Sequence, residues 1–340
     1  MSLRTRSWWA CKGGFCAART CRRYTTTSCI LKMRPSCPSS AGECSSKCPR
    51  TSPFYPRPLT YTRHDSVLRA ADGALTMDAD AYHPEAAAAL RAQFGAHPAV
   101  YAGPLISRGP GAPATPAAQE VQAFLDGQLR ARGERSVLMI SFGSMFWPSD
   151  PAKLQTVLDV VVEADIPFVM SCASPFSAIS DETKSRLNAS GNALLADWVP
   201  QEAVLKHAAT GWCLTHAGHN SVLECIDANV PMILWPIDAD QSTNAIHLSR
   251  TLRIAYELLE IRNGVGLGPI HETGVAPAGT LDAVQMELRG VLGRAFGSER
   301  GEGEEVRARL GELRGELREA WGEGEGGVAR RGVEAFLDSL

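Results

Sequence analysis

The stretch 211–235 constrains the fold of this chain more than any other. A short apolar run (Gly211–Leu214) is followed by a turn (Thr215–His219), by a helical pattern of apolar residues from Asn220, and by a second apolar run (Val230–Trp235). Strand, tight turn, helix and strand predict a βαβ unit in an α/β fold. Ligands of such units bind outside the carboxyl ends of the parallel strands.

The turn of this unit has the properties of an anion site. A helix N-terminus presents free backbone N–H groups and the positive end of the helix dipole. Gly218 permits a close approach of the backbone, and His216, Asn220 and Ser221 add side-chain donors around the same point. A diphosphate fits this arrangement without a metal ion.

Further polar and aromatic residues flank the unit in a fixed order. Trp198 precedes a Pro-Gln pair, Ser221 and Glu224 lie on the predicted helix, and Asp-x-Asp-Gln (238–241) follows the second strand. The whole segment 198–241 resembles the nucleotide-sugar signature of the family 1 UDP-glycosyltransferases, which are inverting enzymes of the two-domain GT-B fold. The resemblance implies a Rossmann-like donor-binding half, with a parallel sheet and helices on both faces.

The resemblance also implies a role for each matching residue. Trp198 matches the tryptophan that stacks on uracil, with Gln201 near the ribose and Glu224 on the ribose hydroxyls. Asp240 and Gln241 match the pair that binds sugar hydroxyls. The UDP-sugar-binding residues expected on these grounds are Ser144, Trp198, Val199, Gln201, His216, Gly218, His219, Asn220, Ser221, Glu224, Asp240 and Gln241.

Ser144 enters this set from a separate element. The run 136–144 is typical of a buried strand ending in a Gly-Ser turn, and it resembles the first strand and loop of the family's donor domain, where the serine faces the phosphates. At three other positions the chain departs from the plant form of the signature. Ala217 stands where cysteine is usual, His219 where tryptophan is usual, and Asn229 where glycine is common.

Other interpretations of the same residues compete with these roles. Ser221-x-x-Glu224 is also the pattern of a capping box, which needs no ligand. His216 and His219 have a spacing that permits a metal pair, but no third ligand is obvious. Asp238 and Asp240 look like a divalent-ion motif of another glycosyltransferase fold. We expect no metal and no cofactor, because the Asp-Gln pair offers acceptors and donors suited to a vicinal diol.

Positive charge and cysteine residues are concentrated at the beginning of the chain. Residues 1–50 carry ten Lys and Arg residues and one acidic residue, and seven of the ten cysteines lie in the first 48 residues. This composition is compatible with a disulfide or zinc module, a transit peptide or a disordered segment. The odd number of cysteines and the absence of Cys-x-x-Cys favour a disordered segment for 1–69. Cys172, Cys213 and Cys225 have core-like surroundings, which favours a reducing, cytoplasmic location.

The rest of the chain divides into four parts. Residues 70–104, with strand-like runs at 73–77 and 98–104 and a helix at 84–94, resemble the end of an N-terminal acceptor domain. A Gly- and Pro-rich linker is expected at 105–119, the donor domain at 120–295, and a helical tail at 296–340. The Gly-rich run 264–268 lacks a G-x-G-x-x-G motif and is interpreted as a loop. No run of 18 apolar residues predicts a transmembrane helix.

The general base of the family has no match in this sequence. None of His64, His83 or His97 lies in a similar context, and only about 35 residues resemble an acceptor domain that needs on the order of 100–200. The catalytic residues are therefore unassigned. Three hypotheses remain: a truncated UDP-glycosyltransferase that passes a hexose to a small lipophilic hydroxyl acceptor, a split transferase half that needs an acceptor-domain partner, and a non-catalytic UDP-sugar-binding module.

Overall fold

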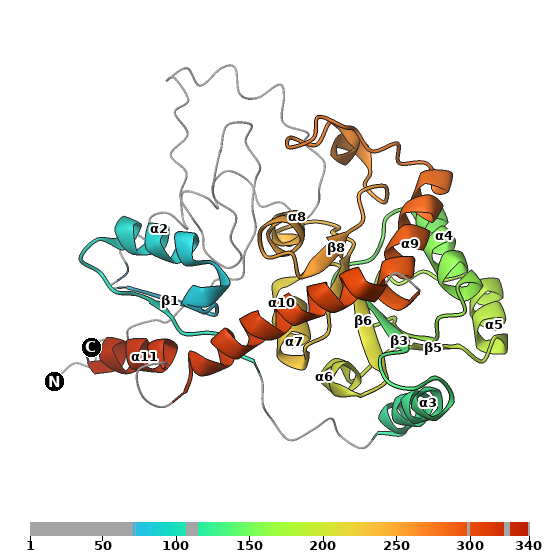
Figure 1. Ribbon diagram of the computed structural model, residues 1–340, viewed down its shortest axis with the longest axis horizontal. Coiled ribbons are helices and arrows are strands. Elements are labelled where there is room, and N and C mark those ends of the chain that lie inside the picture. Colours follow the sequence, from blue (N-terminus) through green and yellow to red (C-terminus); the bar gives the residue numbers. More distant parts are fainter. Residues whose placement is uncertain (1–70, 72, 107–114, 298–299, 323–326, 339–340) are drawn as a thin grey trace.

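The computed structural model describes residues 71, 73–106, 115–297, 300–322 and 327–338 (Figure 1). Six parallel strands form the larger sheet, in the spatial order β5-β4-β3-β6-β7-β8. Their bounds are β3 Val137–Ser141, β4 Phe168–Ser171, β5 Ala193–Ala196, β6 Thr210–Thr215, β7 Met232–Leu234 and β8 Ala255–Glu257. This is the strand order of a doubly wound nucleotide-binding fold, which confirms the expected fold class.

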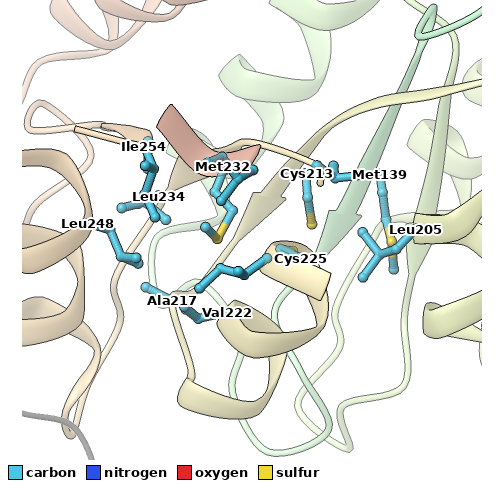
Figure 2. Close-up of a cluster of buried hydrophobic side chains, with 14 of the residues drawn as sticks. Met139, Leu205, Cys213, Ala217, Val222, Cys225, Met232, Leu234, Leu248 and Ile254 are labelled. Carbon is cyan, nitrogen blue, oxygen red and sulfur yellow. The ribbon is translucent and has the colours of Figure 1, made fainter. Parts of the chain in front are cut away.

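Helices cover both faces of this sheet, and alternate residues of each strand point to opposite faces. Met139, Cys213 and Met232 pack on one side against Val222 and Cys225 of the helix after β6 (Figure 2). Leu138, Ile140 and Trp212 pack on the other side. The helices are α3 Pro116–Arg132, α4 Pro151–Glu163, α5 Asp181–Ala189, α6 Gln201–Lys206, α7 His219–Ala228, α8 Gln241–Ile246 and α9 Leu281–Phe296, with a π-helical stretch, η2 His247–Thr251, continuing α8.

The two core cysteines near α7 are buried thiols. Cys213 on β6 and Cys225 on α7 both carry a free thiol in the core shown in Figure 2. Hydrogen bonding with the Cys213 thiol and burial raise the pKa of the Cys225 thiol well above its ordinary value. Both side chains therefore act as small apolar groups, as their sequence context predicts.

A second, smaller unit lies N-terminal to the large sheet. It contains two parallel strands, β1 Ala74–Thr76 and β2 Ala99–Tyr101, with a short 3₁₀ turn, η1 Asp80–Tyr82, and helix α2 Pro84–Phe94 between them. Leu90 of α2 and Tyr101 of β2 belong to its own core cluster. The helix predicted at 84–94 is confirmed.

The end of the chain joins the two units. Helix α10 Arg300–Glu319 packs on α9 and α7 and runs to the smaller unit, where α11 Val328–Asp338 packs on β2 (Figure 1). Val306, Leu310, Leu313 and Leu317 form the buried stripe of α10. The predicted helical tail at 296–340 thus contains two helices, and the second of them packs against the N-terminal unit.

Two segments differ from expectation. Helix α3 begins at Pro116, inside the segment predicted as linker (105–119), because the Thr115 side chain accepts from the Ala118 N–H and caps the helix. The run 264–268 contains a short 3₁₀ turn, η3 Gly264–Leu267, rather than only a loop. The Cys-rich segment 1–69 and most of the predicted linker lie outside the described residues. Within the described ranges, no helix is both long and apolar enough to cross a membrane.

Candidate functional site

The expected donor residues gather at one edge of the large sheet. Strand order reverses between β3 and β6, and ligands of open parallel sheets bind at that point, outside the carboxyl ends of the strands. Ser144 follows β3, Trp198 follows β5, His216 follows β6 and Asp240 follows β7. Because all six strands are parallel, these loops lie at the same edge although the chain separates them by nearly one hundred residues.

The turn between β6 and α7 forms the centre of this edge. Helix α7 begins at His219, one residue earlier than predicted, and its N-cap Gly218 provides no side-chain hydrogen bond. Ala217 before it has a φ of 62°, which turns the backbone sharply into the helix. The first N–H groups of α7 are therefore available to an anion, and the exposed side chains of Ser144 and Asn220 lie on the loops that border them.

His216 is buried beneath this turn and is neutral at pH 7. Only 6% of the residue is exposed, and burial lowers the pKa of its imidazole to about 4, against a smaller opposing contribution from a hydrogen bond with the Ser141 backbone. Its Nδ1 lies 3.4 Å from the Thr215 hydroxyl. A neutral imidazole carries a single N–H, so His216 can donate either to the Ser141 backbone or to a phosphate, and it brings no positive charge.

Gln201 connects the loop after β5 to the strand β3 and the helix α7. Its Oε1 accepts from the Ser141 hydroxyl at 3.0 Å, and its Nε2 donates to Ser221 Oγ at 3.1 Å and to Glu224 Oε2 at 2.5 Å. Burial raises the pKa of Glu224, and the hydrogen bond from Gln201 opposes that shift. Gln201 and Glu224, the two residues expected around the ribose, therefore belong to one hydrogen-bonded group with Ser141 and Ser221.

The capping-box interpretation of Ser221 and Glu224 is wrong. The N-cap of α7 is Gly218, so Ser221 lies within the helix, three residues beyond the cap. Its hydroxyl accepts from the Gln201 side chain at the start of α6 rather than from an N–H at the start of α7.

The loop after β7 holds Asp240 and Gln241 in different ways. Gln241 is 1% exposed, and its Oε1 accepts from the backbone N–H groups of Ile237 and Asp238 at 2.8 and 2.9 Å. Asp240 Oδ2 accepts from Asn244 Nδ2 at 2.9 Å. The carboxamide oxygen of Gln241 is thus occupied in closing its own loop, and direct binding of sugar by this residue stays a prediction.

Asn244 is a site residue that sequence reasoning missed. It is completely buried, and its Nδ2 donates both to Asp240 and to the Ala217 carbonyl at 2.8 Å. It therefore joins the loop after β7 to the turn that precedes α7. The sequence signal is its place four residues after Asp240, the N-cap of α8, because this spacing puts both side chains on one face of a helix.

Trp198 and Val199 lie side by side in the chain but have opposite surroundings. Trp198 is 44% exposed, which is unusual for a large aromatic side chain and leaves its ring available to a planar base. Val199 is buried in the core cluster that contains α7, so its side chain supports the loop. Because the Val199 side chain is buried, only the backbone of Val199 can face a ligand.

The side chain of His219 is directed toward the smaller unit. Its Nε2 lies 2.8 Å from Asp78 Oδ1, and both side chains are almost completely buried. The ring of Tyr82 lies edge-on to it, with the centroids 6.2 Å apart. Asp78, just after β1, was not predicted as a neighbour of this site, because nothing local in its sequence context indicates the contact.

No general base is identified, and one candidate has a structural role. His83 caps α2 by accepting from the Ala86 N–H, and its ring stacks on that of His247 with the centroids 4.3 Å apart. His97 is exposed, and His64 lies outside the described residues. In the described ranges, no group of three or more His, Cys, Asp or Glu side chains is arranged to hold a metal ion.

Comparison with known proteins agrees with this geometry. Residues 99–258, which span β2 to β8, match the family described as UDP-glucoronosyl and UDP-glucosyl transferase. The chain is 38% identical over 219 residues to the UDP-glycosyltransferase eriJ of Hericium erinaceus, covering 64% of this chain and 43% of that protein. It is 39% identical over 125 residues to solanidine UDP-glucose glucosyltransferase 1 of Solanum tuberosum, covering 34% of this chain and 24% of that protein.

Solved structures show the same fold. Medicago truncatula UGT71G1, complexed with UDP-glucose, superposes with a TM-score of 0.64 at 21% identity, over 82% of this chain and 57% of that chain. A transferase from Siraitia grosvenorii in complex with UDP has a TM-score of 0.64 at 21% identity, over 82% and 63% of the two chains. This chain spans less than half the length of the two curated relatives named above. The chain is therefore similar to family 1 UDP-glycosyltransferases over residues 99–258, and it shares its fold with their solved structures.

Proposed function

We propose that this chain binds a UDP-sugar and forms the donor-binding half of an inverting UDP-glycosyltransferase. The observation that supports it most is the arrangement at the strand-order reversal: an uncapped helix start for a diphosphate, with Trp198 and the Gln201–Glu224 pair on one side and Asp240 on the other. The solved relatives with UDP-glucose or UDP bound have this fold.

The transfer itself would move a hexose to a small, lipophilic hydroxyl acceptor. The acceptor hydroxyl would attack C1 of the sugar, lose its proton to a general base, and displace UDP with inversion at C1. Residues for that base and for the acceptor remain unassigned, and an acceptor-domain partner is part of the proposal. Two buried free thiols, Cys213 and Cys225, support a reducing, cytoplasmic location.

A calorimetric titration of the full chain with UDP tests the proposal. One binding site is expected, and Trp198→Ala is expected to weaken it by about 1–3 kcal/mol, because a stacked aromatic side chain is lost. Met286→Ala is the control, since Met286 is a large side chain 69% exposed on α9 and outside the site. Equal affinity in the wild type and Trp198→Ala would exclude stacking, and no binding at all would exclude the donor site.

The same titration in EDTA tests whether a metal ion is needed. Binding is expected to be unchanged, because the helix start, His216 and Ser144 hold the diphosphate in this proposal. Loss of binding that magnesium or manganese restores would show that Asp238 and Asp240 hold an ion.

A further inference from the structure

The loop after β3 carries Phe146, and aromatic contacts of Phe142 and Trp147 hold the loop on either side of that residue. Phe142 is completely buried, and its ring lies edge-on to those of Trp147 and Trp235, with the centroids 5.7 and 5.3 Å apart. Between these anchors, the ring of Phe146 lies against the imidazole of His216, at a centroid distance of 5.7 Å and an angle of 33°. Phe146 is therefore held in place by the loop that carries it.

Two glycines line the same imidazole. A Cβ on Gly143 would lie 2.8 Å from both Cε1 and Nε2 of His216, and a Cβ on Gly218 would lie 2.3 Å from Nε2. Gly143 also has a φ of 73°, whereas Gly218 has an ordinary φ of −65°. Gly218 is thus required for space rather than for backbone conformation. Two loops, after β3 and after β6, together enclose the ring.

This enclosure has a chemical consequence because His216 is uncharged. Burial lowers the pKa of His216 to about 4, so at neutral pH one ring nitrogen carries a proton and the other does not. A cation attracts a phosphate from many directions, but a neutral N–H must point at it to form a hydrogen bond. The orientation of the ring therefore decides what His216 contributes.

We propose that Phe146 is a positioning residue for the donor: with Gly143 and Gly218, it fixes the His216 ring so that a ring nitrogen is presented to the diphosphate of the UDP-sugar. This inference rests on the proposed function of the site. The inference adds Phe146, which lies outside the segment 198–241. Ser144 is the residue of this loop that the sequence analysis expects to face the phosphates.

Binding of UDP-glucose at neutral pH is the first test. Phe146→Ala is expected to weaken binding by about 3- to 10-fold, the range for one neutral hydrogen bond that is no longer held in place. Phe146→Tyr keeps the ring and is expected to retain the affinity. Met145→Ala is the matched control, since Met145 is the neighbouring residue on the same loop and is 57% exposed. Thermal unfolding of each variant verifies that it folds.

Titration of the His216 ring by NMR is the second test, with the resonance assigned from a His216→Asn variant. In the wild type the ring is expected not to titrate above about pH 5, and in Phe146→Ala its pKa is expected to rise toward the ordinary value because water reaches the ring. A loss of stability alone would leave this pKa unchanged.

The two tests separate the possible errors. Unchanged titration and unchanged affinity in Phe146→Ala would overturn the proposal, and so would a shifted titration with unchanged affinity. If the unmodified chain did not bind UDP-glucose, the proposed function would fail. The titration of His216 would then still decide whether Phe146 holds the ring.

Discussion

The large sheet and the small N-terminal unit are stabilised in different ways. The six strands of the large sheet are covered on both faces by extensive apolar clusters, and the residues of β3 and β6 are almost completely buried. The small unit has two parallel strands of three residues each and a core cluster of only four buried side chains. Two strands are not stable in isolation, so the small unit depends on its neighbours.

The junction between the two regions contains both apolar and polar contacts. Ala79 and Tyr82 of the small unit belong to the apolar cluster that includes Leu313 of α10, and several polar contacts accompany them. His247 Nε2 lies 2.9 Å from the Tyr82 carbonyl, the Trp321 indole N–H donates to the Ala102 carbonyl at 2.9 Å, and His219 lies beside Asp78. Directional contacts of this kind position groups more than they stabilise them. We therefore expect the donor site to obtain its rigidity from the large sheet, and the small unit to separate from it at a lower free-energy cost.

The largest expected effect concerns the large sheet. The Arg307 side chain on α10 is 9% exposed and donates to the Asn229 and Gly211 carbonyls at 2.9 and 2.7 Å, and burial lowers its pKa to about 10. Arg307→Ala leaves both carbonyls without these bonds and is expected to lower the free energy of unfolding by about 3 kcal/mol. Urea unfolding of the wild type and the variant measures this difference in the free energy of unfolding.

Arg289→Ala is the matched control for this prediction. Arg289 pairs with Glu163 at 2.7 Å, but both side chains are more than half exposed, so the expected loss is under about 0.5 kcal/mol. If the two arginine variants lost equal stability, the large sheet would not depend on the buried contact of α10.

Acidification is expected to weaken the junction. Burial lowers the pKa of His247 to about 4 and lowers that of His83, whose ring stacks on it, while Glu85 and Asp78 oppose the shift of His83. As the pH falls, His247 binds a proton near pH 6.5 in the unfolded chain but only near pH 4 in the folded chain. The stabilising contribution of neutral His247 is therefore complete above pH 6.5 and is lost as the pH falls to about 4.

Urea unfolding at pH 7 and pH 4.5 measures this loss, which is expected to be on the order of 2 kcal/mol for His247. His247→Gln should reduce the pH dependence. His216→Gln is the comparison variant, because its pKa is also about 4 but its ring lies in the large sheet. Hydrogen exchange should show acid opening of β1 and β2 before β3 in the wild type. Simultaneous opening would show that the two regions form one cooperative unit.

The sequence predicted the parts of this molecule that local patterns encode. Apolar runs located β3 and β6, and the order of residues 198–241 placed Trp198, Gln201, His216 and Asp240 at one edge of a parallel sheet. These predictions succeeded because parallel strands share their carboxyl ends, so position along each strand determines position in space.

The remaining features depend on contacts between distant segments. Nothing near Asp78 indicates that its carboxylate reaches His219, and nothing near Gly218 indicates that its hydrogen atom faces an imidazole. The capping-box pattern at Ser221 does not cap α7, because the helix begins at His219 with Gly218 as its N-cap. Helix α11 lies in the predicted helical tail, but its packing on β2 was not predicted because β2 lies more than 220 residues earlier in the chain.

The smallest expected effect tests the junction most directly. Trp321→Phe keeps an aromatic ring at this position but removes the indole N–H that donates to the Ala102 carbonyl, next to β2. One neutral hydrogen bond is worth about 1 kcal/mol, so amides of β2 should exchange about fivefold faster while those of β3 and β6 keep their rates. Hydrogen exchange followed by NMR resolves the three strands separately.

Equal acceleration in all three strands would mean that the small unit opens only when the large sheet does. The contrast between the two regions would then concern composition rather than stability. Acceleration confined to β2 would mean that the small unit separates while the UDP-sugar site remains folded, which predicts that this variant binds UDP as the wild type does.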